Sequence, residues 1–181
     1  MAKEPRIALL SLLEDENRVK IKDKFSETEW KIYTKMLQNN TLKTSSVGRL
    51  FDAVASALDI INVNTFEAAA PMLFENCALK YQGTEAIDFL ENVEYDRIPS
   101  KLLIENLFKE YSKGTSKQLL AYSFIYTLAK SIISLSRKHN AKIIACSGGV
   151  FQNALLISEV KKMASIEKID LKINRKLSAN D

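Results

Sequence analysis

Residues 143–153 read Ile-Ile-Ala-Cys-Ser-Gly-Gly-Val-Phe-Gln-Asn. The first four residues form an apolar run of strand length, and residues 154–163 behind the segment have the composition of a helix. We therefore expect a strand, a glycine turn and a helix in succession. Gly148 and Gly149 would let the chain turn with positive φ and let a ligand approach the main chain. The helix would then point free N–H groups at that ligand, which favours a phosphate or a carboxylate.

The same turn also has a purely structural interpretation. A glycine pair before a helix is often only a tight connection, so its shape alone does not establish a binding site. Asn153 has two possible roles on the same grounds, as the N-cap of the helix or as a side-chain donor to a ligand. Other parts of the chain have to decide between these alternatives.

A second informative segment spans residues 44–58 and reads Thr-Ser-Ser-Val-Gly-Arg-Leu-Phe-Asp-Ala-Val-Ala-Ser-Ala-Leu. Its three hydroxyl residues offer caps for a helix start. Leu50 and Val54 belong to one apolar face of that helix, and Asp52 lies on the other side. Arg49 and Asp52 are three residues apart, so the residues alone predict a surface ion pair worth a few tenths of a kcal/mol.

Both segments resemble the hydrogenase-maturation carbamoyltransferases of the HypF family. Residues 147–153 are similar to the signature near the C-terminus of that family, and residues 44–55 contain every fixed letter of its pattern Thr-Ser-Ser-x-Gly-Arg-Leu-Phe-Asp-Ala-Val-Ala. The resemblance extends from Glu4 to Asp181. It implies that residues 1–181 are one partial domain, the later half of the carbamoyltransferase domain. The family's acylphosphatase-like, zinc-finger and adenylate-forming domains would lie upstream, outside this chain.

The resemblance also implies a fold, a helix-rich α/β architecture of the actin-like ATPase type. Such a fold has a mixed sheet flanked by helices and a nucleotide cleft between two subdomains. The residues themselves show that helices dominate, and the longest should be a buried central helix. The predicted helices are residues 5–13, 26–38, a helix within 44–58, 100–111 and 116–139. The strand candidates are residues 86–90 and 93–96, as a hairpin, 143–146 and 169–174.

Three further expectations concern the first forty residues. Residues 14–24 are highly charged and are expected to form an exposed loop. Ser26 and Glu29 form a capping-box pattern that opens the second helix. Trp30 on that helix is expected to anchor it in the core.

Carried over by motif, the segment at 44–55 would bind the nucleoside. Asp52 would accept hydrogen bonds from the ribose hydroxyls, and Gly48 would leave room for the nucleotide. Arg49 would contact the nucleotide or simply pair with Asp52.

The segment at 147–153 would bind the phosphate. Gly148 and Gly149 would donate backbone N–H groups, and Asn153 would add a polar contact. Asp181 would be a metal ligand, in a divalent metal site whose histidines lie outside this chain.

The resemblance implies a reaction for the full-length enzyme. It would use carbamoyl phosphate and ATP to make a carbamoyl-adenylate, and pass the carbamoyl group to the C-terminal cysteine of a hydrogenase-maturation partner protein. The product would become the cyanide ligand of a nickel-iron centre. The implied cofactors are therefore ATP or the carbamoyl-adenylate, and a divalent metal.

Several positions depart from the family pattern. Phe66 and Ala68 replace a tyrosine and a glycine, Ile125 replaces a histidine, and Asn174 and Ser178 replace a histidine and a proline. An added methyl group at position 68 would narrow a nucleotide pocket if the glycine serves close approach. These departures leave open a split or degenerate module that binds nucleotide or a partner without turnover.

The tRNA threonylcarbamoyl-transfer enzymes are the other alternative, because they share the frame of the glycine motif. Residues 44–55 and the Phe-Gln after the glycine pair fit the hydrogenase-maturation branch better. With 26 basic and 22 acidic residues the net charge is only +4, and no dense basic patch suggests a nucleic-acid partner.

The composition is that of a globular protein, with 46% hydrophobic and 27% charged residues. No secretory leader and no apolar run of transmembrane length is evident, so a cytoplasmic protein without a membrane partner is expected. Cys77 and Cys146 are expected to be buried free thiols rather than disulfide or metal ligands. His139, the single histidine, should lie at a helix C-terminus.

Overall fold

The computed structural model describes residues 3–39, 41 and 44–173. The chain divides into two compact units. Unit 1 comprises Met1–Phe74 and Ser100–Gly114, and unit 2 comprises Glu75–Pro99 and Thr115–Asp181. The two motifs singled out in the sequence therefore fall in different units.

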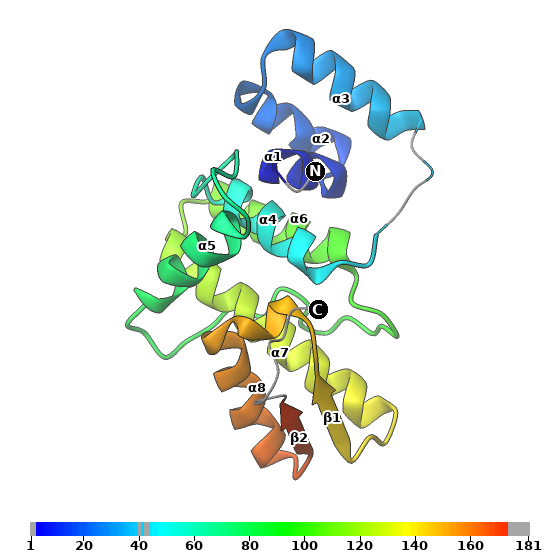
Figure 1. Ribbon diagram of the computed structural model, residues 1–181, viewed down its shortest axis with the longest axis vertical. Coiled ribbons are helices and arrows are strands. Elements are labelled where there is room, and N and C mark those ends of the chain that lie inside the picture. Colours follow the sequence, from blue (N-terminus) through cyan, green and yellow to red (C-terminus); the bar gives the residue numbers. More distant parts are fainter. Residues whose placement is uncertain (1–2, 40, 42–43, 174–181) are drawn as a thin grey trace. The chain divides into compact units, whose positions relative to one another are not determined.

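The secondary structure of the described residues of unit 1 is entirely helical (Figure 1). Helix α1 packs against α4, and both pack against α6. Its core includes the fully buried Leu9, Leu13, Phe51 and Leu107. Its elements are α1 (Pro5–Leu12), α2 (Asp15–Arg18), the 3-10 helix η1 (Val19–Lys24), α3 (Glu27–Asn39), α4 (Val47–Ala57), the first part of α5 (Ala69–Leu79) and α6 (Ser100–Ser112).

Helix α3 begins at the predicted capping box. The Ser26 N–H donates to Glu29 Oε2 at 2.8 Å, and the Glu29 N–H donates to Ser26 Oγ at 3.3 Å. No residue of α3 is buried, and Trp30 is half-buried with its ring 5.8 Å from that of Phe25. The expectation that Trp30 anchors the helix in the core is therefore wrong. Polar contacts attach α3 instead, because Arg6 of α1 donates to both carboxylate oxygens of Glu29.

Residues 14–24 are not the exposed loop that their charge predicts. They form α2 and η1, in which Asn17 and Ile21 are buried. The carboxylate of Glu105, on α6, accepts hydrogen bonds from the Glu14 backbone N–H and from the Asn17 side chain. A buried carboxylate thus satisfies the N-terminus of α2, which the local sequence could not show.

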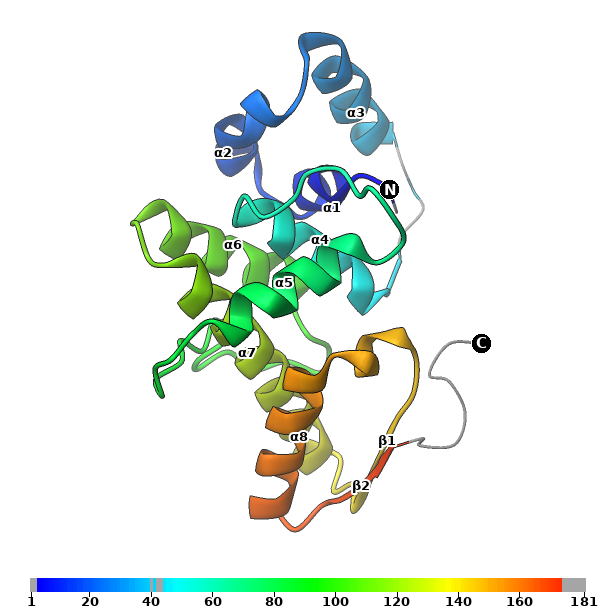
Figure 2. The same cartoon turned by 60° about the vertical axis from the view of Figure 1, so that its left-hand side comes forward.

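Unit 2 contains the predicted strand, glycine turn and helix. Strand β1 (Ile143–Cys146) leads through the 3-10 helix η2 (Gly149–Gln152) into α8 (Ala154–Ile166), and the chain returns in β2 (Asp170–Ile173). The strands are parallel, with Ile143 opposite Asp170 and Cys146 opposite Ile173. Helix α8 packs against β2 and against α7 (Lys117–Lys138), as Figure 2 shows. The described strands form this parallel pair rather than the mixed sheet that was expected.

Helix α7 is the predicted long, mostly buried helix. The Ser116 side chain caps it by accepting from the Leu119 N–H at 3.2 Å, and His139 is its C-cap residue. By length and composition alone α7 could cross a membrane, which corrects the expectation that no apolar run is long enough. However, 56% of its apolar window is buried, and the core helix of a globular protein meets the same criterion.

The hairpin predicted at residues 86–96 is wrong. This described segment contains no strand. The backbone N–H groups of Ile87 and Phe89 donate instead to Ser123 Oγ (3.0 Å) and Thr127 Oγ1 (3.1 Å) on α7. Hydroxyl side chains four residues apart on one face of α7 thus take the place of a neighbouring strand.

Candidate functional site

Arg49 and Asp52 form an ion pair on α4. Arg49 Nη1 lies 2.6 Å from Asp52 Oδ2, and the Asp52 side chain is only 1% exposed whereas that of Arg49 is 29% exposed. The expectation of a surface pair on the polar side of the helix is therefore wrong. All residues from 50 to 57 are buried, because α4 packs between other helices of unit 1 and has no fully solvated side along this stretch.

The Asp52 carboxylate is poorly satisfied within the protein. Among the described residues, neither of its oxygens has a hydrogen-bond partner of good geometry, and Arg49 Nη1 has none either. The contact between them is a close ion pair without hydrogen-bond alignment. A buried polar group left in this state typically costs about 1–3 kcal/mol. Such a group calls for an explanation, and a ligand that donates hydrogen bonds is one.

Burial raises the pKa of Asp52 above its ordinary value. The positive charge of Arg49 and weak hydrogen-bonding contacts from the side chains of Asn64 and Arg49 lower this pKa, but by less than burial raises it. These contacts do not reach the geometry of a well-formed hydrogen bond. The folded protein therefore holds this carboxylate at an energetic cost when it is ionised.

Gly48 lies in the first turn of α4. Among the described residues, a Cβ added there would meet only Ser46 Oγ, at 3.5 Å, which is an ordinary contact. Nothing in this part of the protein therefore requires glycine at position 48. Ser46 is the N-cap residue by position, but its side chain makes no capping hydrogen bond, and Thr44 Oγ1 instead accepts from the Ser46 N–H at 3.1 Å.

The glycine turn of unit 2 depends on Gly148. Its φ of 93° and ψ of 161° lie in a region that is essentially restricted to glycine. Among the described residues, no atom would lie within 4 Å of a Cβ at this position, so this part of the chain leaves the space beside the turn open. Within the described residues, the backbone N–H groups of Gly148 and Gly149 donate to no protein acceptor. The turn can therefore present two main-chain donors to a ligand.

The N-terminus of α8 differs from the prediction, because its N–H groups are not free. Glu75 Oε1, on α5, accepts from the N–H groups of Ala154 (2.7 Å) and Leu155 (3.2 Å). Asn153 Oδ1 accepts from the Leu156 N–H at 2.7 Å, which confirms Asn153 as the N-cap. The first three amide groups of the helix are thus satisfied by side chains.

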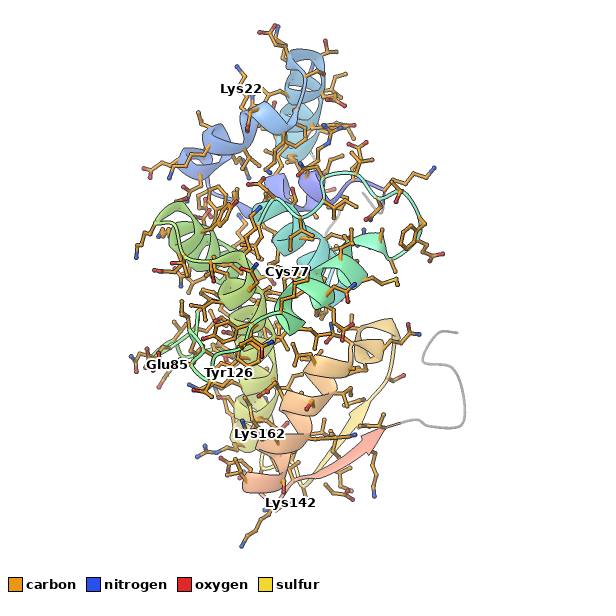
Figure 3. All side chains as sticks on the ribbon, turned by 90° about the vertical axis from the view of Figure 1, so that its left-hand side faces the viewer. Lys22, Cys77, Glu85, Tyr126, Lys142 and Lys162 are labelled. Carbon is orange, nitrogen blue, oxygen red and sulfur yellow. The ribbon has the colours of Figure 1, made fainter. Side chains whose placement is uncertain are left out.

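Neither cysteine is placed as an activated nucleophile. Both are free thiols, and Cys146 is buried as predicted, whereas Cys77 on α5 is only half-buried (Figure 3). Burial raises the pKa of both thiols, and a raised pKa lowers the fraction of reactive thiolate. The described residues contain no group of three His, Cys, Asp or Glu that could hold a metal ion. Asp181, the predicted metal ligand, lies outside the described residues, as do Asn174 and Ser178.

Two departures from the family pattern gain a structural explanation. Ala68 has a φ of 63°, in the left-handed region that disfavours side chains with a Cβ, so glycine at this position has a backbone reason. Ile125 is fully buried within α7, at the position where the family pattern has histidine. Position 125 is therefore part of the apolar core in this chain.

The six described site residues fall into two groups. Unit 1 brings Gly48, Arg49 and Asp52 together on α4, and unit 2 brings together the glycine pair and Asn153 between β1 and α8. Sequence reasoning missed Glu75, which lies 79 residues before its nearest partner. No local pattern marks that contact.

The whole chain matches a known family. The family described as "Carbamoyltransferase, Kae1-like Domain, second subdomain" matches residues 1–181. The chain belongs to this family, that of the HypF carbamoyltransferases.

Two curated relatives carry the family name. "Carbamoyltransferase HypF" of Synechocystis sp. is 31% identical over 120 residues, which cover 64% of this chain and 15% of that protein. "Carbamoyltransferase HypF homolog" of Cupriavidus necator is 27% identical over 159 residues, which cover 80% of this chain and 39% of that protein. The chain thus spans well under half the length of these HypF relatives.

Solved HypF structures are similar in fold. A crystal structure of full-length HypF in its phosphate- and nucleotide-bound form matches with a TM-score of 0.82 and 23% identity, over 99% of this chain and 25% of that one. The HypF of T. kodakarensis matches with a TM-score of 0.75 and 22% identity, over 95% of this chain and 24% of that one. The chain therefore has a helix-rich α/β fold with a small parallel sheet, similar to that of HypF.

Proposed function

We propose that this chain is part of a carbamoyltransferase of hydrogenase maturation, and that its contribution is to bind an adenine nucleotide. The observation that carries the proposal is the Asp52 carboxylate, which is 1% exposed and lacks a well-aligned hydrogen-bond donor within the described residues. The similar full-length HypF structure was solved with phosphate and nucleotide bound. A nucleotide would supply the donors that Asp52 lacks.

Asp52 would accept hydrogen bonds from the two ribose hydroxyls. A carboxylate has two oxygens, and hydrogen bonds to an ionised acceptor are roughly twice as strong as neutral ones. Such bonds would also offset the burial that raises the pKa of Asp52. Arg49 would hold the carboxylate in place through the 2.6 Å contact, and Gly48 would leave space beside it.

The glycine turn would bind the phosphate. Gly148 and Gly149 offer adjacent N–H groups without a protein acceptor among the described residues. Adjacent main-chain N–H groups form anion-binding sites in many proteins. Fixed donors of this kind would also stabilise negative charge that develops on a leaving phosphate.

The reaction of the full-length enzyme would follow the family. Carbamoyl phosphate and ATP would give a carbamoyl-adenylate, and the carbamoyl group would pass to the C-terminal cysteine of a partner protein. The raised pKa values of Cys77 and Cys146 fit an acceptor thiol outside this chain. A divalent metal bound with the help of Asp181, the actin-like ATPase architecture and a cytoplasmic location remain predictions of the same resemblance.

One observation favours a second candidate. Ile125 is fully buried at the position of the family's histidine, so that side chain is unavailable for chemistry in this chain. A module that binds nucleotide or a partner without turnover would fit this difference. The nucleotide-binding form of this candidate shares the Asp52 site with the first and differs from it in whether the full-length protein transfers a carbamoyl group.

The test is a calorimetric titration of the chain with ATP and Mg²⁺. Asp52→Ala should weaken binding at least tenfold, because it removes the acceptor for the ribose hydroxyls. Asp15→Ala is a matched control, since Asp15 forms an ion pair of the same spacing with Arg18 at 2.8 Å but is 94% exposed. It should bind as the unmodified chain does. Equal affinity of the Asp52 variant, or no binding by the unmodified chain, would contradict the proposal.

A further inference from the structure

Glu75 occupies a position that a ligand phosphate could have taken. Its Oε1 accepts from the N–H groups of the first two residues of α8, at 2.7 and 3.2 Å. These groups form the positive end of the helix dipole, which favours an anion. The observed anion is a side chain of the protein itself, from a helix 79 residues earlier in the chain.

The N-terminus of α8 is complete without a ligand. Asn153 Oδ1 accepts from the third amide group, that of Leu156, and Asn153 O accepts from the fourth, that of Ile157, at 3.2 Å. All four N-terminal N–H groups therefore have acceptors within the protein. A phosphate could bind there only by displacing Glu75.

The glycine turn lies immediately before this closed terminus. The donor of Gly148 precedes the single turn of 3-10 helix, Gly149–Gln152, that leads into α8, and the donor of Gly149 begins it. The Glu75 carboxylate therefore holds a negative charge at the helix terminus that follows these donors within one turn of the chain. Repulsion between like charges grows with the charge of the ligand.

We propose that Glu75 determines specificity for the phosphate group, by closing the N-terminus of α8 and by disfavouring multiply charged phosphates at the glycine turn. The phosphate would then bind the turn alone, and a ligand with one phosphate would lose less affinity than a triphosphate. This inference rests on the proposed nucleotide function. The inference goes beyond that function by assigning to the negative charge of Glu75 a role in the specificity for phosphate groups.

The first test compares ligands of increasing charge. Adenosine, AMP and ATP are titrated without added metal into the unmodified chain and into Glu75→Gln, which keeps an oxygen acceptor for the helix but removes the charge. We expect affinity to rise about threefold to tenfold for ATP, less for AMP and not at all for adenosine. The matched control is Glu167→Gln, which removes a charge from the other end of α8 and should change none of the three affinities.

The second test is independent of nucleotide binding. Inorganic pyrophosphate is added to the unmodified chain and to Glu75→Ala, and the amide resonances of Ala154 and Leu155 are followed by NMR. We expect saturable shifts only in Glu75→Ala, because only there are both N–H groups free.

The outcomes separate the two proposals. If the unmodified chain binds none of the three nucleosides and nucleotides, the proposed function fails, while the pyrophosphate experiment still decides the role of Glu75. Shifts of Ala154 and Leu155 in the unmodified chain, or their absence in Glu75→Ala, would overturn the closure of α8. An equal gain in affinity for adenosine and ATP would overturn the selection by charge.

Discussion

The Asp52 carboxylate in α4 and the N-terminus of α8 are both polar groups within motifs that identify the family, but they are satisfied very differently. Asp52 is 1% exposed and has no well-aligned hydrogen bond among the described residues. The first three N–H groups of α8 all donate to side chains of the protein. A protein retains an unsatisfied buried group where function requires it, so the difference fits our proposals of a ligand at Asp52 and of closure at α8.

The largest expected effect comes from Gly148, which forms the turn before α8 and to which we assign a ligand-binding role in the proposed function. Gly148→Ala should lower the free energy of unfolding by about 1–3 kcal/mol, because its φ of 93° is unfavourable for any residue with a Cβ. No atom of the described residues lies within 4 Å of that Cβ, so we attribute the loss to strain of the backbone. Urea denaturation measures the change.

Gly48→Ala is the matched control. Position 48 is helical, and alanine there should keep or raise the free energy of unfolding, by about 0.5–1 kcal/mol at most. ATP affinity should nevertheless fall in this variant if the ligand approaches Gly48. A destabilised Gly48→Ala, or a stable Gly148→Ala, would contradict the assignment.

A smaller effect on stability is expected from substitution of Ala68. This substitution tests whether glycine at this position relieves strain of the backbone or makes room for a ligand. Ala68→Gly should raise the free energy of unfolding by about 1 kcal/mol, because Ala68 has a φ of 63°. Ala69→Gly is the control. Ala69 is the first residue of α5, so glycine at this position should lower the free energy of unfolding by about 1 kcal/mol. Calorimetry with ATP completes the test. A gain in ATP affinity without a gain in stability would show that glycine at this position serves the ligand.

The smallest effect concerns two carboxylates with opposite pKa shifts. Hydrogen bonds from Arg6, and then from the Ser26 backbone, lower the pKa of Glu29 to about 2. The contribution of Glu29 to stability is therefore present above its ordinary pKa of 4.5 and is lost as the pH falls towards about 2. Asp52 has a raised pKa, so its contribution is present below its ordinary pKa of 3.8 and is lost as the pH rises through the higher folded value.

Trp30, the single tryptophan, lies on α3 beside Glu29 and reports the titration of Glu29. Its fluorescence should change between pH 4.5 and about 2 in the unmodified chain, and this step should be absent in Glu29→Gln. Glu27→Gln removes an exposed carboxylate from the same turn and should leave the step in place. An unchanged step in Glu29→Gln would mean that Glu29 does not control the attachment of α3.

Much of the fold could be predicted where the signal is local. The apolar run before the glycine pair gave β1 and α8, the Ser26 and Glu29 pattern gave the start of α3, and the long apolar stripe gave α7. Each of these elements is specified by neighbouring residues. The family, too, could be recognised from two short segments.

The predictions that failed depend on partners far away in the chain. Asp52 was placed on the polar side of α4, but packing against α1 and α6 buries that side as well. Residues 86–96 look like strands, yet their backbone groups bond to hydroxyls of α7. The contact of Glu75 with α8 has no local signal at all. Tertiary contacts override local propensity in each case.

Asp52→Asn tests the central claim most directly, with the free energy of unfolding and ATP affinity measured on the same variant at pH 7. The substitution preserves shape and removes a charge whose pKa is raised by burial. Because burial raises the pKa of Asp52, the neutral amide avoids the cost of an ionised buried carboxylate. We therefore expect the free energy of unfolding to be kept or to rise, while ATP affinity falls at least tenfold. A less stable variant with unchanged ATP affinity would show that Asp52 is a structural residue and would contradict the account.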